Sequence, residues 1–134
     1  MILGIGIDLV SVSRIEDLMR RFGEKFAQKI FTASEIAKAE KIAFDDNFAP
    51  RAIFYAKRFA AKEAFVKACG LGIGRGIDFR DIEVCNDHLG KPIIKILNDK
   101  EKFLHQLFSV TKLSIHLSLT DEVPLAQAMV LLEG

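Results

Sequence analysis

Two glycines and an aspartate share one face of the strand that the N-terminus predicts. Residues 2–10 read ILGIGIDLV, a short apolar run rich in isoleucine, which is typical of a β-strand. Because side chains alternate between the faces of a strand, Gly4, Gly6 and Asp8 lie on the same face. The aliphatic side chains of the opposite face, which we expect to be packed, are Leu3, Ile5, Ile7 and Leu9. Glycine inside a strand often marks a close approach by a ligand or another backbone. The glycine face therefore predicts a strip of backbone without side chains that ends at the carboxylate of Asp8.

Helices are predicted over most of the first half of the chain. Ser13 and Glu16 have the spacing of a capping box, and a helix from Ser13 would end at Gly23. Thr32 and Glu35 have the same spacing and predict a short helix to about residue 43. The stretch FDDNFAP (44–50) is typical of a loop, and a long helix is expected over about 51–69, with proline at its start and glycine after its end.

The second half of the chain predicts mostly strands. We expect strands at about 81–86 and 92–97, a helix at about 99–109, and strands at 112–120 and 125–133. The turn DEVP (121–124) between the last two strands favours an antiparallel hairpin. Helices followed by mostly antiparallel strands indicate the α+β class, with a mostly antiparallel sheet packed against helices. No linker or repeat divides residues 1–134, so a single domain is expected.

Composition excludes some other classes of protein. Half of the 134 residues are hydrophobic and 28% are charged, as in an ordinary globular domain. The apolar runs are too short to span a bilayer, and the N-terminus lacks the features of a signal peptide, so we expect a cytoplasmic protein. Cys69 and Cys85 have neither CxxC spacing nor clustered histidines, which favours buried reduced thiols.

Positive charge is concentrated in one segment, although the formal net charge of the chain is only +1. Residues 51–75 contain six basic residues and a single acid, Glu63. The basic residues are Arg51, Lys57, Arg58, Lys62, Lys67 and Arg75. A solvated helix face explains many such runs, but one this one-sided also favours an anionic ligand.

An ionic pair interrupts the otherwise apolar long helix. In FAAKEAFVK (59–67), Glu63 and Lys67 are one helical turn apart and therefore lie on one face. Such a pair is usually surface decoration that contributes about 0.3–0.5 kcal/mol. Together with Asp8, however, it completes a set of two carboxylates and a cation that could hold Mg²⁺ and a phosphate. The spacing alone does not bring residues 8 and 63 together.

Two segments resemble the signature motifs of holo-acyl-carrier-protein synthases, the small branch of the 4′-phosphopantetheinyl transferases. They are GIGIDLVSVSRIE (4–16) and RFAAKEAFVKACGLGIG (58–74). Comparable stretches are DIEV (81–84), GKP (90–92) and IHLSLTDE (115–122), so the similarity covers nearly the whole chain. The resemblance implies transfer of 4′-phosphopantetheine from coenzyme A to a serine of apo acyl carrier protein, with release of adenosine 3′,5′-bisphosphate. It also implies a role in fatty acid biosynthesis.

The resemblance also implies roles for individual residues. Asp8 and Glu63 match the carboxylates that bind Mg²⁺, and Lys67 matches a lysine that stabilises the departing phosphate. The acceptor of the serine proton stays open between Glu63, Asp8 and a metal-bound water, and we favour a water assisted by a carboxylate. Residues at positions matching the coenzyme A contacts are Arg58, Lys62, Lys67, Gly70, Gly72 and His116.

Two positions depart from related patterns. Larger, two-lobed relatives carry an acid two residues after the aspartate, where this chain has Val10, so water is expected to complete the metal shell. Many relatives have a histidine about where Thr120 stands, which leaves His116 as the only histidine of that strand.

Partners and assembly are implied by the resemblance as well. The carrier is acidic along its recognition helix, and Arg14 and Arg21, two turns apart on the first helix, would suit its docking. Small-branch synthases are homotrimers with active sites between subunits. The glycine face of the first strand could also meet a neighbour.

Two other functions compete with the transferase. One is a catalytically silent module that binds coenzyme A or a carrier, but the complete set of Asp8, Glu63 and Lys67 argues against silence. The other is a nucleic-acid binder that uses the basic segment, which the near-neutral total charge disfavours. We expect no nucleic-acid or membrane partner.

Overall fold

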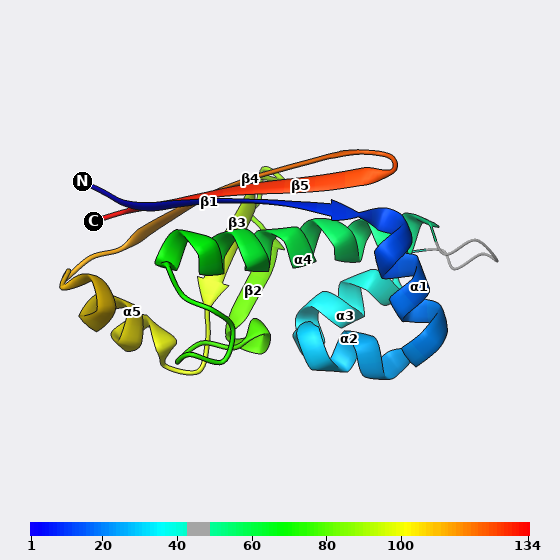
Figure 1. The fold of residues 1–134 in the computed structure, drawn as a ribbon, viewed down its shortest axis with the longest axis horizontal. Helices are drawn as coiled ribbons and strands as arrows, with labels where there is room; N and C mark the ends of the chain where they lie inside the picture. Colours follow the sequence, from blue (N-terminus) through cyan, green and yellow to red (C-terminus); the bar gives the residue numbers. More distant parts are fainter. Residues whose placement is uncertain (43–48) are drawn as a thin grey trace.

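A single long helix forms the middle of the molecule, with strands on one side and shorter elements on the other (Figure 1). The computed structural model describes residues 1–42 and 49–134. Strand β1 (Ile2–Ser11) leads into α1 (Val12–Phe22), α2 (Glu24–Ile30), α3 (Ala33–Glu40) and the long helix α4 (Ala49–Cys69). The turn η1 (Phe79–Asp81), β2 (Ile82–Asn86), β3 (Pro92–Ile96), α5 (Lys100–Phe108), β4 (Ser114–Glu122) and β5 (Leu125–Glu133) follow.

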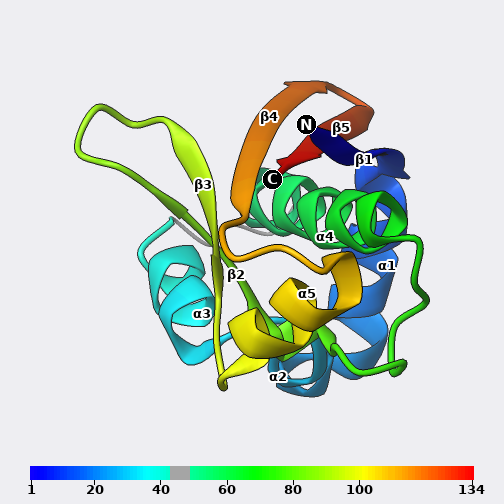
Figure 2. The same cartoon turned by 90° about the vertical axis from the view of Figure 1, so that its left-hand side faces the viewer.

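The strands form two separate antiparallel sheets. One has the order β1–β5–β4, so the first strand of the chain pairs with the last. The other is the β2–β3 hairpin, which projects away from the helices (Figure 2). The chain ends lie together, because Met1 and Gly134 exchange backbone hydrogen bonds. The α+β class and the antiparallel hairpin at the C-terminus are therefore confirmed.

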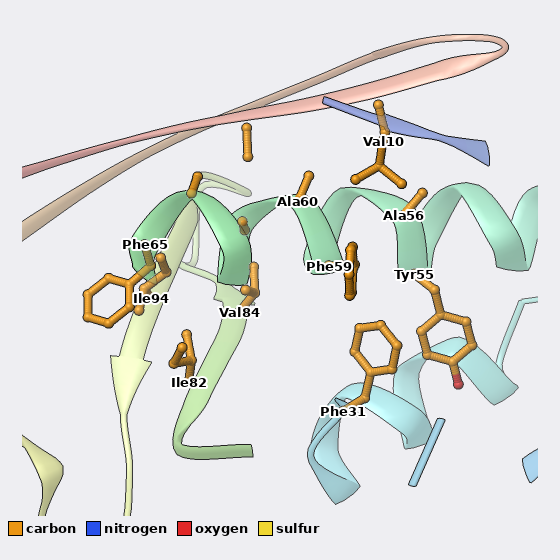
Figure 3. Packing of buried hydrophobic residues seen from close by; sticks show 14 of the residues in the cluster. Val10, Phe31, Tyr55, Ala56, Phe59, Ala60, Phe65, Ile82, Val84 and Ile94 are labelled. Atoms are coloured by element: carbon orange, nitrogen blue, oxygen red, sulfur yellow. The ribbon is translucent and has the colours of Figure 1, made fainter. Parts of the chain in front are cut away.

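Helix α4 is buried against neighbours on opposite sides (Figure 3). Ala56 and Ala60 face the three-stranded sheet, where Val10 lies against them. On the other side, Tyr55 packs on Phe31 with 4.4 Å between ring centroids. A helix enclosed in this way needs apolar residues around most of its circumference, which explains the apolar sequence in which Glu63 and Lys67 stand out.

The packing of β1 is the reverse of the sequence prediction. The glycine face, and not the aliphatic face, lies against the protein: Gly4 contacts the carbonyl of Ala68, and Gly6 contacts that of Ala64. Any Cβ at either position would overlap the helix backbone. The side chains of Ile5, Ile7 and Leu9 are 63%, 53% and 58% exposed on the outer face of the sheet. The close approach that glycine indicated is thus made by α4.

Several predicted boundaries need correction. The N-cap position of the first helix is Ser11, whose side chain makes no capping hydrogen bond. Ser13 lies inside the helix, so there is no capping box at Ser13. The capping box of Thr32 and Glu35 is present. Helix α2 was not predicted, because residues 24–30 are too few to show a clear period. The predicted loop over 44–50 and the end of the preceding helix near residue 43 fall mostly outside the described residues.

The two cysteines are free, as predicted. Cys69 is buried, and burial raises the pKa of its thiol to about 12, whereas Cys85 is half-buried. No helix within residues 1–42 and 49–134 has the length and apolar character needed to cross a bilayer.

Candidate functional site

The contact between β1 and α4 brings Asp8 beside the Glu63–Lys67 turn. Gly6 rests on the carbonyl of Ala64, which follows Glu63 directly, and Asp8 lies two residues further along the same face of β1. The ammonium of Lys67 donates to Asp8 Oδ1 over 2.9 Å and to the carbonyl of Ile7 over 3.0 Å. The close packing of two backbones thus joins residues that are far apart in the sequence.

Asp8, Glu63 and Lys67 form a cluster of charged side chains, in which the neighbouring charges act on the pKa of Glu63. Partial burial, and then the neighbouring Asp8 carboxylate, raise the pKa of Glu63 above its ordinary value, while Lys67 and Arg14 oppose the shift. A carboxylate with a raised pKa is a better proton acceptor near neutral pH than an ordinary glutamate. The cluster therefore places a potential base next to a second carboxylate and a cation.

Arg14 lies at the edge of the same cluster. Its guanidinium stands over the ring of Phe59, 5.6 Å from the ring centroid, and its charge acts on the Glu63 carboxyl group. Helix α1 carries Arg14 there because the helix starts directly at the end of β1. The predicted carrier-docking residue and the predicted metal ligand are thus electrostatic neighbours.

Two carboxylates suit a magnesium ion that also takes water and substrate oxygens as ligands. Asp8 and Glu63 supply carboxylates from two elements held rigidly together by the glycine contact. The described residues contain no group of three or more histidine, cysteine, aspartate or glutamate side chains that could form a complete protein cage. The donor set therefore fits Mg²⁺ better than a structural zinc ion.

Lys62 requires a correction, because it lies inside the protein. Its side chain is fully buried, and its ammonium donates to Glu35 Oε1 over 2.6 Å and to the carbonyls of Ile30 and Phe79 over 2.9 Å each. Burial lowers the pKa of Lys62, and Glu35 opposes the shift. All three donors are used, so in this geometry Lys62 holds α2, α3 and η1 against α4 and has none left for a phosphate.

Arg58 is also buried, but its guanidinium makes few hydrogen bonds. Its guanidinium stacks on the ring of Phe54 at 3.6 Å from the centroid, and Nη2 donates to Asn86 Oδ1 over a long 3.3 Å. The Nε atom is buried without a hydrogen-bond partner. A buried arginine whose Nε has no partner is unusual, because unpaired buried polar groups are costly.

The remaining predicted residues lie at different places around the molecule. Gly70 has a φ of +71° and ends α4, with its N–H donating to the carbonyl of Lys67 over 3.0 Å. A Cβ atom added at Gly72 would have the Arg75 side chain as its nearest neighbour, 3.9 Å away. His116 is on the outer face of the sheet, where Nε2 lies 3.0 Å from Glu133 Oε2. Arg21 is exposed and stands 5.3 Å from the centroid of the Phe22 ring. The structure thus unites Asp8, Glu63, Lys67 and Arg14, but not Arg58, Lys62 or His116.

The basic segment is not one surface. Lys57 pairs with Asp121 over 3.2 Å, Lys62 pairs with Glu35, and Lys67 pairs with Asp8. Arg51 donates to the carbonyls of Glu40 and Ile42. These side chains point in different directions around the helix. The excess of positive charge counted along residues 51–75 therefore overstates the positive potential at any one surface.

Two partners were missed by the sequence reasoning. Glu35 was predicted only as a capping residue, yet it also accepts from Lys62 and from the backbone N–H of Val84. Asn86 was not considered as a partner of Arg58. One signal could have indicated that Lys62 is buried: the small residues Ala60, Ala61 and Ala64 surround it on α4.

Comparison with known proteins identifies the family. The sequence profile of the 4′-phosphopantetheinyl transferase superfamily matches residues 4–128. The holo-[acyl-carrier-protein] synthase of Bartonella bacilliformis is 46% identical over all of this chain and 97% of that protein. The enzyme of the same name from Rhizobium meliloti is 44% identical, with 100% and 93% covered.

Solved structures agree with the sequence comparisons. The crystal structure of holo-[acyl-carrier-protein] synthase from Neisseria meningitidis matches with a TM-score of 0.86, 38% identity and full coverage of both chains. The Bacillus anthracis enzyme, solved in complex with CoA (3′,5′-ADP), matches with a TM-score of 0.78 and 37% identity over 98% of this chain and 96% of that one. This chain therefore belongs to the holo-acyl-carrier-protein synthases of the 4′-phosphopantetheinyl transferase superfamily.

Proposed function

We propose that this protein transfers the 4′-phosphopantetheine group from coenzyme A to a serine hydroxyl of an apo acyl carrier protein in a Mg²⁺-dependent reaction. The observation that carries the proposal is the meeting of Asp8, Glu63 and Lys67 at the β1–α4 contact. The proposal includes release of adenosine 3′,5′-bisphosphate, a role in fatty acid biosynthesis and a cytoplasmic location. Related synthases solved with coenzyme A support the choice of substrate.

Each residue of the cluster has a distinct part in the reaction. Asp8 and Glu63 would hold Mg²⁺, which when bound neutralises charge on the diphosphate of coenzyme A. The serine oxygen forms a bond to the β-phosphorus, and the bond from that phosphorus to the bridging oxygen breaks. Lys67 stabilises the departing oxygen. The acceptor of the serine proton would be Glu63, Asp8 or a metal-bound water, and we favour a water assisted by one of these carboxylates.

Arg58 is our candidate for a phosphate contact of coenzyme A outside the metal cluster. Its unpaired Nε and its weak bond to Asn86 leave donor capacity that an anionic group would use. Gly70 and Gly72, in the loop after α4, are sterically open and suit a nearby phosphate. Lys62 is left out of the proposed contacts because it is buried and fully bonded.

We infer that the active protein is a trimer with sites between subunits. The exposed Ile5, Ile7 and Leu9 form an apolar strip on the outer face of the sheet, which supports association through this face. His116 lies on the same face, since it pairs in register with Leu131, which pairs with Ile5. In a trimer, His116 would therefore serve the site of a neighbouring subunit.

The carrier is proposed to dock on α1. Arg14 and Arg21 are both exposed on this helix, and Arg14 lies beside the cluster to which the serine must be delivered. Two positive charges on one exposed helix would attract an acidic helix of the carrier.

The test is the intact mass of an apo acyl carrier protein after incubation with this protein, coenzyme A and Mg²⁺. We expect a mass increase of one phosphopantetheine group, and none when EDTA is present. Asp8→Asn and Glu63→Gln should fold normally, by circular dichroism, but lose at least a hundredfold in rate, as expected when a group that positions the metal or takes a proton is removed. Glu24→Gln, an exposed glutamate on α2, is the matched control and should react like the unmodified protein.

Near-normal turnover by either site variant would refute the assignment of Asp8 and Glu63 as ligands of Mg²⁺. Binding of coenzyme A without transfer to several carriers would instead favour the second candidate, a module that binds coenzyme A but does not react.

A further inference from the structure

Lys67 makes two hydrogen bonds to β1, and both are exposed to solvent. The ammonium bonds Asp8 and the carbonyl of Ile7, while the side chain is 54% exposed and that of Asp8 only 15%. Asp8 is thus held by a partner that can move into solvent. Among the contacts at this site, the Lys67 side chain is the part that can rearrange most easily, because a long exposed side chain has many accessible rotamers.

The backbones on either side of the site cannot rearrange in the same way. Gly4 and Gly6 press against the carbonyls of Ala68 and Ala64, and these contacts fix β1 on α4 at the level of the two carboxylates. A change in the ligands of Asp8 therefore has to be absorbed by side chains. Asp8 therefore stays beside the turn of α4 that carries Glu63, whichever cation it binds.

Charge makes Lys67 and a divalent ion compete for Asp8. An ammonium 2.9 Å from Asp8 Oδ1 repels a divalent cation that approaches the same carboxylate. When the cation takes this carboxylate, the ammonium loses an anionic partner and gains a positive neighbour. The diphosphate of the substrate then becomes the favourable partner for the ammonium.

We propose that Lys67 is a displaceable cation, which holds Asp8 in the metal-free protein and is released toward the substrate diphosphate when a divalent cation binds. The inference rests on the proposed function, because it takes Asp8 and Glu63 as metal ligands. It adds an order of events: the metal frees the lysine, and only the freed lysine contacts the phosphate that departs.

The first test measures Mn²⁺ affinity by electron paramagnetic resonance, with no coenzyme A present. Lys67→Met keeps most of the side-chain length and removes the charge, so it should bind Mn²⁺ about tenfold more tightly than the unmodified protein. Lys67→Arg keeps the charge and should show no gain. Lys57→Met is the matched control, because Lys57 lies on the same helix and pairs with Asp121, and its affinity should be unchanged.

The second test needs no variant. Acetylation of lysines by a water-soluble ester is followed by peptide mass spectrometry with and without Mg²⁺, again in the absence of coenzyme A. The reactivity of Lys67 should rise several-fold on Mg²⁺ addition, whereas that of Lys57 should stay constant. Unchanged or reduced reactivity of Lys67 overturns the proposal.

The outcomes separate this proposal from the proposed function. If Asp8→Asn abolishes Mn²⁺ binding but Lys67→Met gives no tighter binding, the metal site stands and the displacement is refuted. If Mn²⁺ binds without any dependence on Asp8, or does not bind in the absence of coenzyme A, the displacement is also refuted. In that case the carrier mass assay decides the function independently.

Discussion

At the scale of single residues, Gly6 decides whether the site can form. Its Cα lies so close to the carbonyl oxygen of Ala64 that any side chain would overlap the backbone of α4. Since neither the strand nor the helix backbone can shift like a flexible side chain, the two elements would have to separate. Asp8 would then move away from Glu63 and Lys67.

Gly6→Ala is therefore expected to lower the free energy of unfolding by about 3 kcal/mol, at the upper end of the range for overpacking. The measurement is urea denaturation followed by circular dichroism. Gly72→Ala is the control, since its nearest neighbour would be 3.9 Å away, and it should change stability by less than about 1 kcal/mol. A Gly6→Ala protein as stable as the control would show that the contact is not rigid.

Adjacent residues can have opposite environments, as Lys62 and Glu63 show. Both stand in the motif KEA, yet Lys62 is fully buried in an ion pair with Glu35 and Glu63 belongs to the partly exposed cluster. Neighbours along a helix point about 100° apart, so they face different parts of the protein. A motif fixes residue types and spacing but does not reveal which members contact a ligand.

At the scale of elements, α4 joins two structures that the rest of the chain builds separately. One side receives β1 against a row of alanines, and the other receives Phe31 and the β2–β3 hairpin (Figure 3). The predicted helix and its glycine end were correct because both depend on local sequence signals. The direction in which each cation of the basic segment points depends on which element lies opposite, and no local signal contains that information.

The exposed side of α1 is the element for which we predict a binding role. Arg21→Glu should weaken binding of the acidic carrier about tenfold, because reversing a charge replaces attraction with repulsion, and it should leave coenzyme A affinity unchanged. Isothermal titration calorimetry measures both. Arg21 is a cleaner choice than Arg14, whose charge also acts on Glu63.

Lys102→Glu is the control for nonspecific charge effects, because it reverses the charge of an exposed residue on α5. Equal losses in the Arg21 and Lys102 variants would mean that overall charge, and not docking on α1, governs carrier binding.

At the scale of the whole molecule, β1 carries an exposed apolar strip on the outer face of the three-stranded sheet. Ile5, Ile7 and Leu9 are all more than half exposed, and Met129 beside Ile7 is 43% exposed. Contiguous apolar surface of this kind is typical of interfaces between proteins. The face lies opposite the glycine contact, so association there would leave the packing of β1 on α4 unchanged.

Ile7→Glu is expected to convert a trimer into monomers, because it would bury a charge in the centre of an apolar interface. Light scattering after size exclusion should change from about 45 kDa, three times the 15.0 kDa chain, to the mass of one chain. Leu89→Glu, at the exposed tip of the β2–β3 hairpin, is the matched control and should stay trimeric. A monomeric unmodified protein would refute the trimer directly.

Local sequence signals were enough to predict the helices and strands and to single out three charged residues. Periodicity, caps and turn residues predicted the strands, the long helix and the C-terminal hairpin, and the motifs indicated Asp8, Glu63 and Lys67. The predicted strands, long helix and hairpin were confirmed because they depend on residues close together in the chain. Long-range packing, in contrast, sets which face of β1 is buried, brings Asp8 to the Glu63–Lys67 turn and pairs Lys62 with Glu35. Periodicity shows which residues share a face, but which face packs inward depends on the surface opposite it, and that surface comes from distant parts of the chain.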